Sequence, residues 1–195
     1  RIIVDQKIAD EFAKKFADKA RNLPLGDPRK PEPVVLGSVI GMSTVEHCNA
    51  LVDDALAKGA RLLCGGKADS TLMPATVLDH VTPAMRIYHE ETFGPVKCIV
   101  RVKNTEEAIA CANDNEYGLS AAVFGKDIAR AFNVARKIDS GICHVNGPTV
   151  HDEAQMPFGG VKGSGIGRFG GKAGIAEFTE LRWVTVQTTP RHYPF

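Results

Sequence analysis

Residues Glu90–Val96 carry the densest group of side chains that could contact a small ligand. The segment reads Glu-Glu-Thr-Phe-Gly-Pro-Val and comes immediately before an apolar, strand-like run. The carboxylate of Glu91 offers two acceptor oxygens, which suit a vicinal diol such as a ribose, and Phe93 offers a flat apolar face for a planar ring. Gly94 permits close approach of a ligand, and Pro95 fixes the direction of the chain as it enters the strand. A solvated acidic turn with one core phenylalanine is the alternative that these residues leave open.

The remaining polar clusters point less clearly to chemistry. His151-Asp152-Glu153 has the residue types of an acid–base catalytic group, but polar residues of this kind are also frequent in surface loops. His47 and His89 have no second ligand at a helical or short-loop spacing, which argues against a metal site. His144 follows Cys143 in an apolar run, and we expect it to be a satisfied core histidine.

A glycine-rich tract, Gly159–Gly174, has eight glycines in sixteen residues. Within it Gly165–Gly170 matches the Gly-x-Gly-x-x-Gly pattern of dinucleotide-binding loops, whose mechanism requires a buried strand leading straight into the loop. The preceding residues, Met156–Gly163, are not strand-like. The tract is therefore predicted to be a tight loop that wraps a neighbouring site.

Composition indicates an ordinary globular protein. Of the 195 residues 44% are hydrophobic and 24% charged, and the net charge of +1 gives no reason to expect nucleic acid or an anionic membrane as partner. No apolar run reaches the length of a spanning helix. The cysteines are odd in number and form no Cys-x-x-Cys pair, which indicates free thiols in a reducing compartment, the cytoplasm. They are Cys48, Cys64, Cys98, Cys111 and Cys143.

Hydrophobic periodicity predicts alternating helices and strands. The helices are expected at 6–21, from a capping box at Ser43–Glu46 to Gly59, at 104–112, at 127–138 and at 173–181. The strands are expected at 1–4, 60–64, 75–78, 96–102, 118–124, 142–146 and 182–188. This alternation predicts an α/β fold, a layered open sheet, largely parallel, with flanking helices.

Several short motifs, taken in their order and spacing, resemble the aldehyde dehydrogenase superfamily. The resemblance runs from Ile2 to about Gln187 and corresponds to the C-terminal, catalytic-domain half of such enzymes. Within the family, Cys143–Glu153 and Gly167–Phe178 resemble the branch that acts on aromatic aldehydes such as salicylaldehyde, benzaldehyde or vanillin. The motifs are Glu90–Val96, Asn113 with Tyr117-Gly118-Leu119, Asn146-Gly147, Pro157–Lys162 and Ser164–Arg168.

This resemblance implies an NAD(P)-dependent oxidation of an aldehyde to its carboxylic acid through a cysteine thiohemiacetal and thioester. NAD is the expected coenzyme and NADP the alternative. Carried over by position, Glu91 would accept hydrogen bonds from the nicotinamide-side ribose, and Phe93 would back the nicotinamide. The family's nucleophilic cysteine and base glutamate would lie upstream of Arg1. We therefore expect no catalytic residue in this chain and no activity from it alone.

The resemblance also implies substrate and subunit contacts. Val150, His151 and Phe158 would border the aldehyde substrate, and relatives often carry Gln and Lys near the coenzyme where this helix has Thr44 and His47. Residues 1–178 would form the catalytic-domain portion. Residues 179–195 would form an oligomerisation strand and tail, through which a homodimer or homotetramer assembles.

Two alternatives remain open on the sequence. The chain could belong to an aliphatic or semialdehyde dehydrogenase, which a substrate panel would separate from an aromatic one. It could also be a stand-alone, catalytically dead subunit that binds or scaffolds an intact relative.

Overall fold

The computed structural model describes residues 1–195 and divides the chain into two compact units, Arg1–Asn115 and Glu116–Phe195. The sequence did not indicate a boundary at Asn115. The division at residue 178 that the family resemblance implies concerns domains of the whole enzyme, and it stays a prediction. No helix of the structure combines the length and the apolar character that a membrane span needs.

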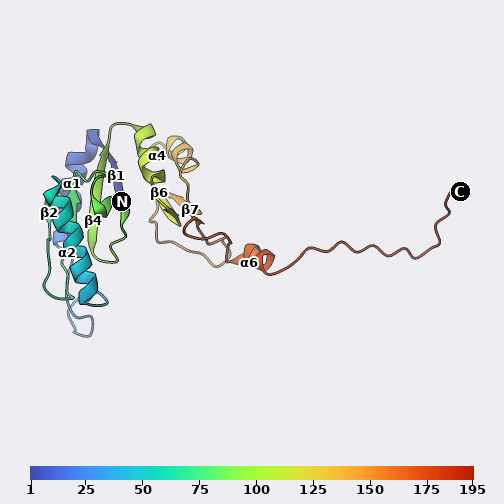
Figure 1. Ribbon diagram of the computed structural model, residues 1–195, viewed down its shortest axis with the longest axis horizontal. Helices are drawn as coiled ribbons and strands as arrows, with labels where there is room; N and C mark the ends of the chain where they lie inside the picture. Colours follow the sequence, from blue (N-terminus) through green and yellow to red (C-terminus); the bar gives the residue numbers. More distant parts are fainter. The chain divides into compact units, whose positions relative to one another are not determined.

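A four-stranded sheet organises the first unit (Figure 1). β4 pairs in parallel with β1 on one side and with β3 on the other, and β2 closes the sheet antiparallel to β3. In spatial order the strands are β1 (Ile2–Asp5), β4 (Val96–Val102), β3 (Thr76–Asp79) and β2 (Arg61–Cys64).

Helix α1 (Gln6–Arg21) covers one face of this sheet. The side chain of Asp5 accepts a hydrogen bond from the N–H of Lys7 at 2.9 Å and caps the helix where β1 ends. Alanines on one side of α1 then pack against Val77 and Ile99 of the sheet. Small residues let the helix approach the strands closely.

Helices α2 (Met42–Ala57), α3 (Arg86–His89) and α4 (Thr105–Asn113) contribute to the core on the opposite face. β4 alternates between the two cores, as its sequence predicted, with Ile99 on the α1 side and four residues on the α2 side. Those four are Val96, Cys98, Val100 and Val102. The first unit is therefore a sheet between two helical layers.

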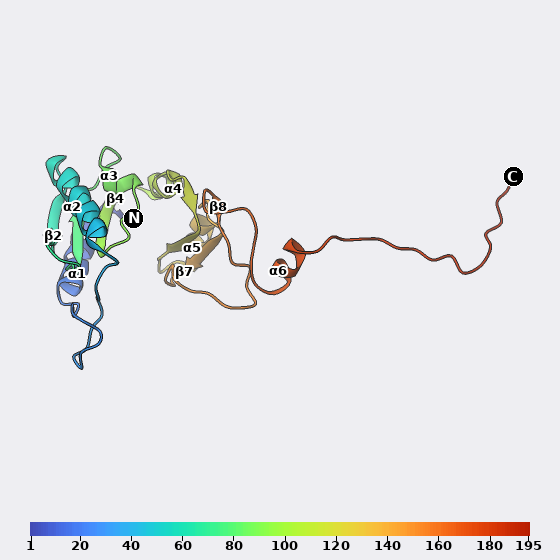
Figure 2. The ribbon, with the colours of Figure 1, turned by 60° about the horizontal axis from the view of Figure 1, so that its bottom comes forward.

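The second unit contains two small sheets (Figure 2). Strands β6 (Ser120–Val123) and β7 (Ile142–Val145) pair in parallel, and α5 (Ile128–Ala135) connects them and packs on both. β5 (Tyr117–Gly118) pairs antiparallel with β8 (Val161–Lys162), and α6 (Gly171–Glu177) begins within the glycine-rich tract.

The prediction of an α/β fold with a largely parallel sheet and flanking helices is confirmed. Some details were wrong. The capping box at Ser43–Glu46 does not form, because α2 already begins at Met42 after an extended Gly41 and has no side-chain cap. The single strand expected at 118–124 is divided at Leu119 between two sheets, because β5 pairs with β8 whereas β6 pairs with β7. The short α3 was not predicted.

The segment predicted as a strand at 182–188 forms no helix or strand in this chain. Its side chains are exposed, including Trp183 and Val186. A strand requires a hydrogen-bonded partner, and no segment of the chain pairs with this one. Its role in oligomerisation stays a prediction.

Candidate functional site

The loop between α3 and β4, residues Glu90–Pro95, is held to the first unit by hydrogen bonds to a side chain at one end and to the backbone at the other. The guanidinium of Arg86 donates to both carboxylate oxygens of Glu90, at 2.7 and 2.9 Å. The carbonyl oxygen of Pro95 accepts from the N–H of Thr76 at 2.8 Å, at the start of β3. Both ends of the loop are thereby fixed.

Two neighbouring side chains of α2 reach the middle of the loop. Nε2 of His47 lies 3.0 Å from the carbonyl oxygen of Glu91. Sγ of Cys48 lies 3.3 Å from the carbonyl oxygen of Thr92. A Cβ added at Gly94 would lie 2.6 Å from the same sulfur, so the glycine permits the loop to approach the helix.

Glu91 and Phe93, the predicted coenzyme-binding residues, have their side chains free. Glu91 is exposed, and its carboxylate makes no hydrogen bond or ion pair within the chain. The ring of Phe93 is 78% exposed, although a large aromatic side chain normally gains free energy by burial. The backbone of Phe93 also has a φ of 47°, in the left-handed region that costs a residue with a Cβ about 1 kcal/mol or more.

The predicted substrate-side residues lie in the second unit. Val150 and His151 are exposed neighbours in the segment between β7 and β8, and Val150 is 90% exposed. Phe158 is half-buried and joined to Phe169 by two backbone hydrogen bonds of 2.8 and 2.7 Å. Val150 and His151 lie together only because they are consecutive in the sequence, and the structure records no contact between them and Phe158.

The expectation that His144 is a satisfied core histidine was wrong. Its Nε2 is buried and has no hydrogen-bond partner, and its ring meets that of His151 edge to face with centroids 5.4 Å apart. Nε2 of His151 lies 3.4 Å from a carboxylate oxygen of Glu153. The contact between the two histidines joins a strand to a loop seven residues on, and no local sequence signal predicts it.

None of the five cysteines has the surroundings of a reactive nucleophile. All are free thiols, four of them buried and Cys143 half-buried. Burial raises the pKa of the thiols of Cys48, Cys64, Cys98 and Cys143 above the ordinary value. A raised pKa lowers the fraction of thiolate, the form that attacks a carbonyl.

The glycine-rich tract is held by hydrogen bonds between its own residues. The guanidinium of Arg168 donates to the carbonyl oxygens of Gly160 and Gly167, at 2.8 and 2.9 Å. Gly170 has a φ of 85°, and an added Cβ there would lie 2.2 Å from the carbonyl oxygen of Met156. β8, the strand that precedes the Gly165–Gly170 motif within the tract, has only two residues, so the motif lacks the long buried strand of a dinucleotide-binding loop.

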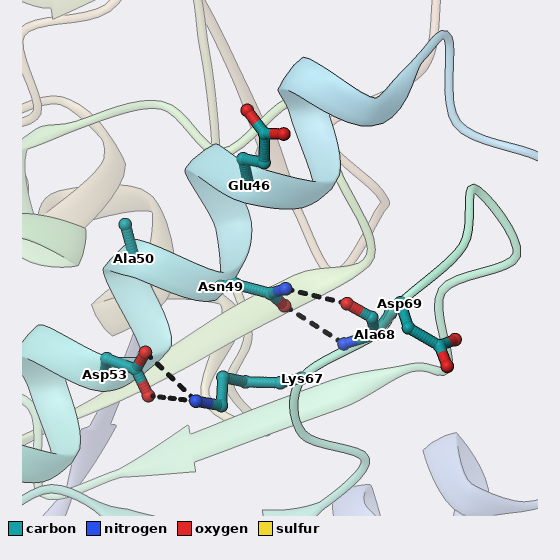
Figure 3. A pocket seen from close by; sticks show the side chains of 7 residues that line it. All are labelled: Glu46, Asn49, Ala50, Asp53, Lys67, Ala68 and Asp69. Atoms are coloured by element: carbon teal, nitrogen blue, oxygen red, sulfur yellow. Dashed lines mark hydrogen bonds and ion pairs between the residues drawn. The ribbon is translucent and has the colours of Figure 1, made fainter.

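A pocket of about 660 Å³ lies between α2 and the β2–β3 connection, and His47 is not among the residues that line it (Figure 3). Asn49 pairs through both amide atoms with the backbone of Ala68, at 2.7 and 3.0 Å, and Lys67 pairs with Asp53. These pairs fasten the β2–β3 connection to the helix. They are structural contacts, so the pocket gives no reason to move the candidate site from the Glu90–Pro95 loop.

Glu91 and Phe93 were selected from the sequence as candidates, and their role stays a prediction, but the sequence did not indicate how their loop is held. The anchoring residues His47, Cys48 and Arg86 lie on other elements. The short spacing of Arg86 and Glu90, at i and i+4, is a signal that could have indicated their ion pair. The contacts from α2 bridge 44 residues and have no such signal.

Comparison with known proteins places this geometry in a family. The sequence profile of the aldehyde dehydrogenase family matches residues 1–184. The chain is 55% identical over 194 residues to the vanillin dehydrogenase of Pseudomonas fluorescens, covering 100% of this chain and 40% of that protein. The chain thus spans about 40% of the length of the curated relatives it matches.

Solved structures agree. The salicylaldehyde dehydrogenase of Pseudomonas putida G7, complexed with salicylaldehyde, superposes with a TM-score of 0.91 at 50% identity, covering 99% of this chain and 40% of that one. An aldehyde dehydrogenase of Mycobacterium tuberculosis complexed with NAD+ has a TM-score of 0.85 at 32% identity over 92% of this chain and 38% of its own. A glyceraldehyde-3-phosphate dehydrogenase of Bacillus halodurans complexed with NADP superposes with a TM-score of 0.85 at 39% identity. The match covers 90% of this chain and 36% of that one. The chain therefore belongs to the aldehyde dehydrogenase family.

Proposed function

We propose that this chain is the C-terminal part of an NAD(P)-dependent aldehyde dehydrogenase that oxidises an aromatic aldehyde to its carboxylic acid. The observation that carries the proposal is the Glu90–Pro95 loop, whose backbone is anchored while Glu91 and Phe93 project without partners. Exposed, strained and unpartnered residues on an anchored loop are typical of a ligand contact.

In this proposal Glu91 accepts hydrogen bonds from the hydroxyls of the nicotinamide-side ribose, and Phe93 backs the nicotinamide ring. The residues present suit the coenzyme, because a free carboxylate and a flat apolar face lie two positions apart. The coenzyme supplies the acceptor for the hydride that leaves the aldehyde carbon. NAD is the proposed coenzyme and NADP the alternative, since relatives are found with either.

The nucleophile is proposed to lie outside this chain. The four cysteines whose pKa is raised by burial are poor sources of thiolate, and Cys111 is buried as well. A thiohemiacetal and then a thioester would form on a cysteine supplied by the rest of the enzyme. We therefore expect the 195-residue chain alone to be inactive.

The proposed substrate class rests on similarity. Relatives at 50–55% identity are named for vanillin and salicylaldehyde. Val150, His151 and Phe158 are the proposed substrate-side residues, and they offer apolar surface to an aromatic ring.

Assembly and location are proposals of the same kind. Residues 182–188, exposed and without a partner strand in this chain, would add to the sheet of another subunit in a homodimer or homotetramer. Deletion of residues 181–195 from the full-length enzyme should lower the mass of the assembly measured by light scattering, and an unchanged mass would contradict the subunit role.

The proposed location is the cytoplasm, because the five cysteines of the chain are free thiols.

The coenzyme role is tested in the full-length enzyme that contains this chain. Glu91→Ala should raise KM for NAD by about 10- to 100-fold, because hydrogen bonds to a charged group contribute about 1.5–3 kcal/mol. Phe93→Ala should raise it too, by loss of the contact surface. Glu32→Ala, which changes an exposed glutamate of the loop between α1 and α2, is the matched control. Equal kinetics for Glu91→Ala and Glu32→Ala would refute the assignment.

The substrate class is tested by rates with a panel of aldehydes. We expect kcat/KM to be higher for vanillin, salicylaldehyde and benzaldehyde than for aliphatic aldehydes and semialdehydes. The reverse order would favour an aliphatic or semialdehyde dehydrogenase.

A further inference from the structure

His47 lies on the turn of α2 that faces the Glu90–Pro95 loop, and its contact has a defined direction. Nε2 is 3.0 Å from the carbonyl oxygen of Glu91. A carbonyl oxygen only accepts hydrogen bonds, so Nε2 carries a hydrogen and donates. This holds for the neutral Nε2–H tautomer and for the charged ring alike, so the contact does not require a protonated histidine.

We propose that His47 is a positioning residue for coenzyme binding, which holds the Glu91 carbonyl and so sets the direction in which Glu91 and Phe93 project. This inference rests on the coenzyme role proposed above for those two residues. His47 acts through the backbone of the loop, because the nitrogen that faces the loop is already engaged by the carbonyl.

The loop needs such an anchor because its conformation is not the one it would adopt freely. Phe93 has a φ of 47°, a region that residues with a Cβ avoid, and its side chain gains little burial in return. Contacts elsewhere in the loop must therefore hold this conformation.

Among these contacts the hydrogen bond from His47 is the one made to Glu91 itself. The neighbouring contact from Cys48 to the Thr92 carbonyl uses a thiol, which is a weak donor. The fork from Arg86 holds Glu90, one residue earlier, through its side chain. Removal of the imidazole therefore frees the carbonyl at the residue whose carboxylate is proposed to bind the ribose.

The structure provides a matched control on the neighbouring helix. Nε2 of His89 lies 3.1 Å from the carbonyl oxygen of Pro83, so it makes the same kind of contact at nearly the same distance. Pro83 lies before α3 and outside the Glu90–Pro95 loop. His89→Ala thus removes an equivalent hydrogen bond within the same unit and leaves the anchoring of Glu91 intact.

The test measures the dissociation constant for NAD, by calorimetry, in the full-length enzyme. His47→Ala should raise this constant about fivefold, the effect of one neutral hydrogen bond. His47→Gln, whose amide can donate to the same carbonyl, should bind within about twofold of the parent, and so should His89→Ala. An unchanged constant in His47→Ala, a failure of glutamine to restore binding, or an equal loss in His89→Ala would each overturn the inference.

Amide hydrogen exchange gives a second readout that does not depend on activity. In His47→Ala the amides of Thr92–Gly94 should exchange faster, while those of β4 keep the rates of the parent. Faster exchange throughout the first unit would show a general loss of stability and would overturn the positioning role.

Glu91→Ala separates this inference from the proposed function. If Glu91→Ala weakens NAD binding and His47→Ala does not, the positioning role alone fails. If Glu91→Ala binds NAD as the parent does, the coenzyme role of the loop fails, and the inference about His47 fails with it.

Discussion

The two units differ in how they use their apolar side chains. In the first unit, helices on both faces of the sheet enclose it, and Leu78 and Ile99 have no exposed surface. In the second, Ala131 and Ala135 are the only buried apolar side chains, whereas Phe124 is 71% and Phe132 55% exposed. Exposed apolar surface of this kind is typical of an interface. The comparison indicates that the first unit supplies its own core, whereas the second leaves much of its apolar surface exposed in this chain.

The same difference separates the two groups of candidate residues. The Glu90–Pro95 loop belongs to the first unit and is anchored by Arg86, His47 and Cys48. The segment with Val150 and His151 belongs to the second unit, where the 3.4 Å pair between His151 and Glu153 is exposed and so contributes little. We expect the Glu90–Pro95 loop to keep its geometry in the isolated chain more faithfully than the segment with Val150 and His151.

The largest effect should come from the ion pair inside the first unit. Arg101 donates to both carboxylate oxygens of Asp79, at 3.0 and 2.6 Å, and Asp79 is 2% exposed. Arg101→Ala leaves a buried charge without its partner, which should lower the free energy of unfolding by about 3–5 kcal/mol. Asp10→Ala is the control, because it removes the partner of Arg101 that is 92% exposed and should cost about 1 kcal/mol or less. Equal losses in urea denaturation would contradict the distinction.

A pair of core variants compares the units directly. Leu78→Ala should lower the free energy of unfolding by about 2–5 kcal/mol, because the side chain is fully buried. Phe132→Ala should cost about 0.5 kcal/mol or less in this chain, because more than half of the ring is exposed. In the full-length enzyme, the loss for Phe132→Ala should rise if α5 is covered there. An unchanged small loss in the full-length enzyme would show that this surface stays open.

A smaller effect is expected at the end of β7. Asn146 has a φ of 57°, and its amide accepts from the N–H of Gly125 at 2.8 Å and donates to its carbonyl at 2.9 Å. Asn146→Ala should lower the free energy of unfolding of the second unit by about 1–2 kcal/mol, through loss of both hydrogen bonds. Faster hydrogen exchange of the Gly125 amide in the variant would show that the hydrogen bond to residue 146 is lost. Asn146→Gly, which adopts the same φ without strain, separates the backbone contribution from the hydrogen bonds.

The smallest effect concerns the pH dependence of the first unit. Burial raises the pKa of Asp79, but the hydrogen bonds from Arg101 and from the N–H of His80 outweigh it and hold this pKa below the ordinary value. The contribution of Asp79 to stability is therefore complete above about pH 4, the ordinary pKa, and is lost as the pH falls through the lower folded value. Thermal unfolding between pH 5 and 2 should show this loss in the parent, and Arg101→Ala should lack it.

The sequence predicted the elements of the first unit well, because local signals and tertiary packing agree there. Residues 6–21 and 96–102 have the helical and alternating patterns that their structures require. In the second unit the run 118–124 has a uniform strand composition, yet Gly118 and Ser120 pair with different strands. Which strand a residue pairs with is decided by contacts distant in sequence, and composition does not encode it.

The candidate site shows the same limit. Glu91 and Phe93 could be selected from their residue types and spacing alone. That His47 and Cys48 hold the loop could not, because their partners are backbone carbonyl oxygens, which every residue has. The sequence also could not predict that Nε2 of His144 lacks a hydrogen-bond partner, because this depends on the atoms that surround it in space.

The anchoring of the Glu90–Pro95 loop through main-chain carbonyls has a consequence for protein engineering. The contacts to Glu91 and Thr92 are made to atoms that survive any replacement of the side chains. Substitutions at residue 91 should therefore change its side chain alone and leave the contacts beneath it as they are.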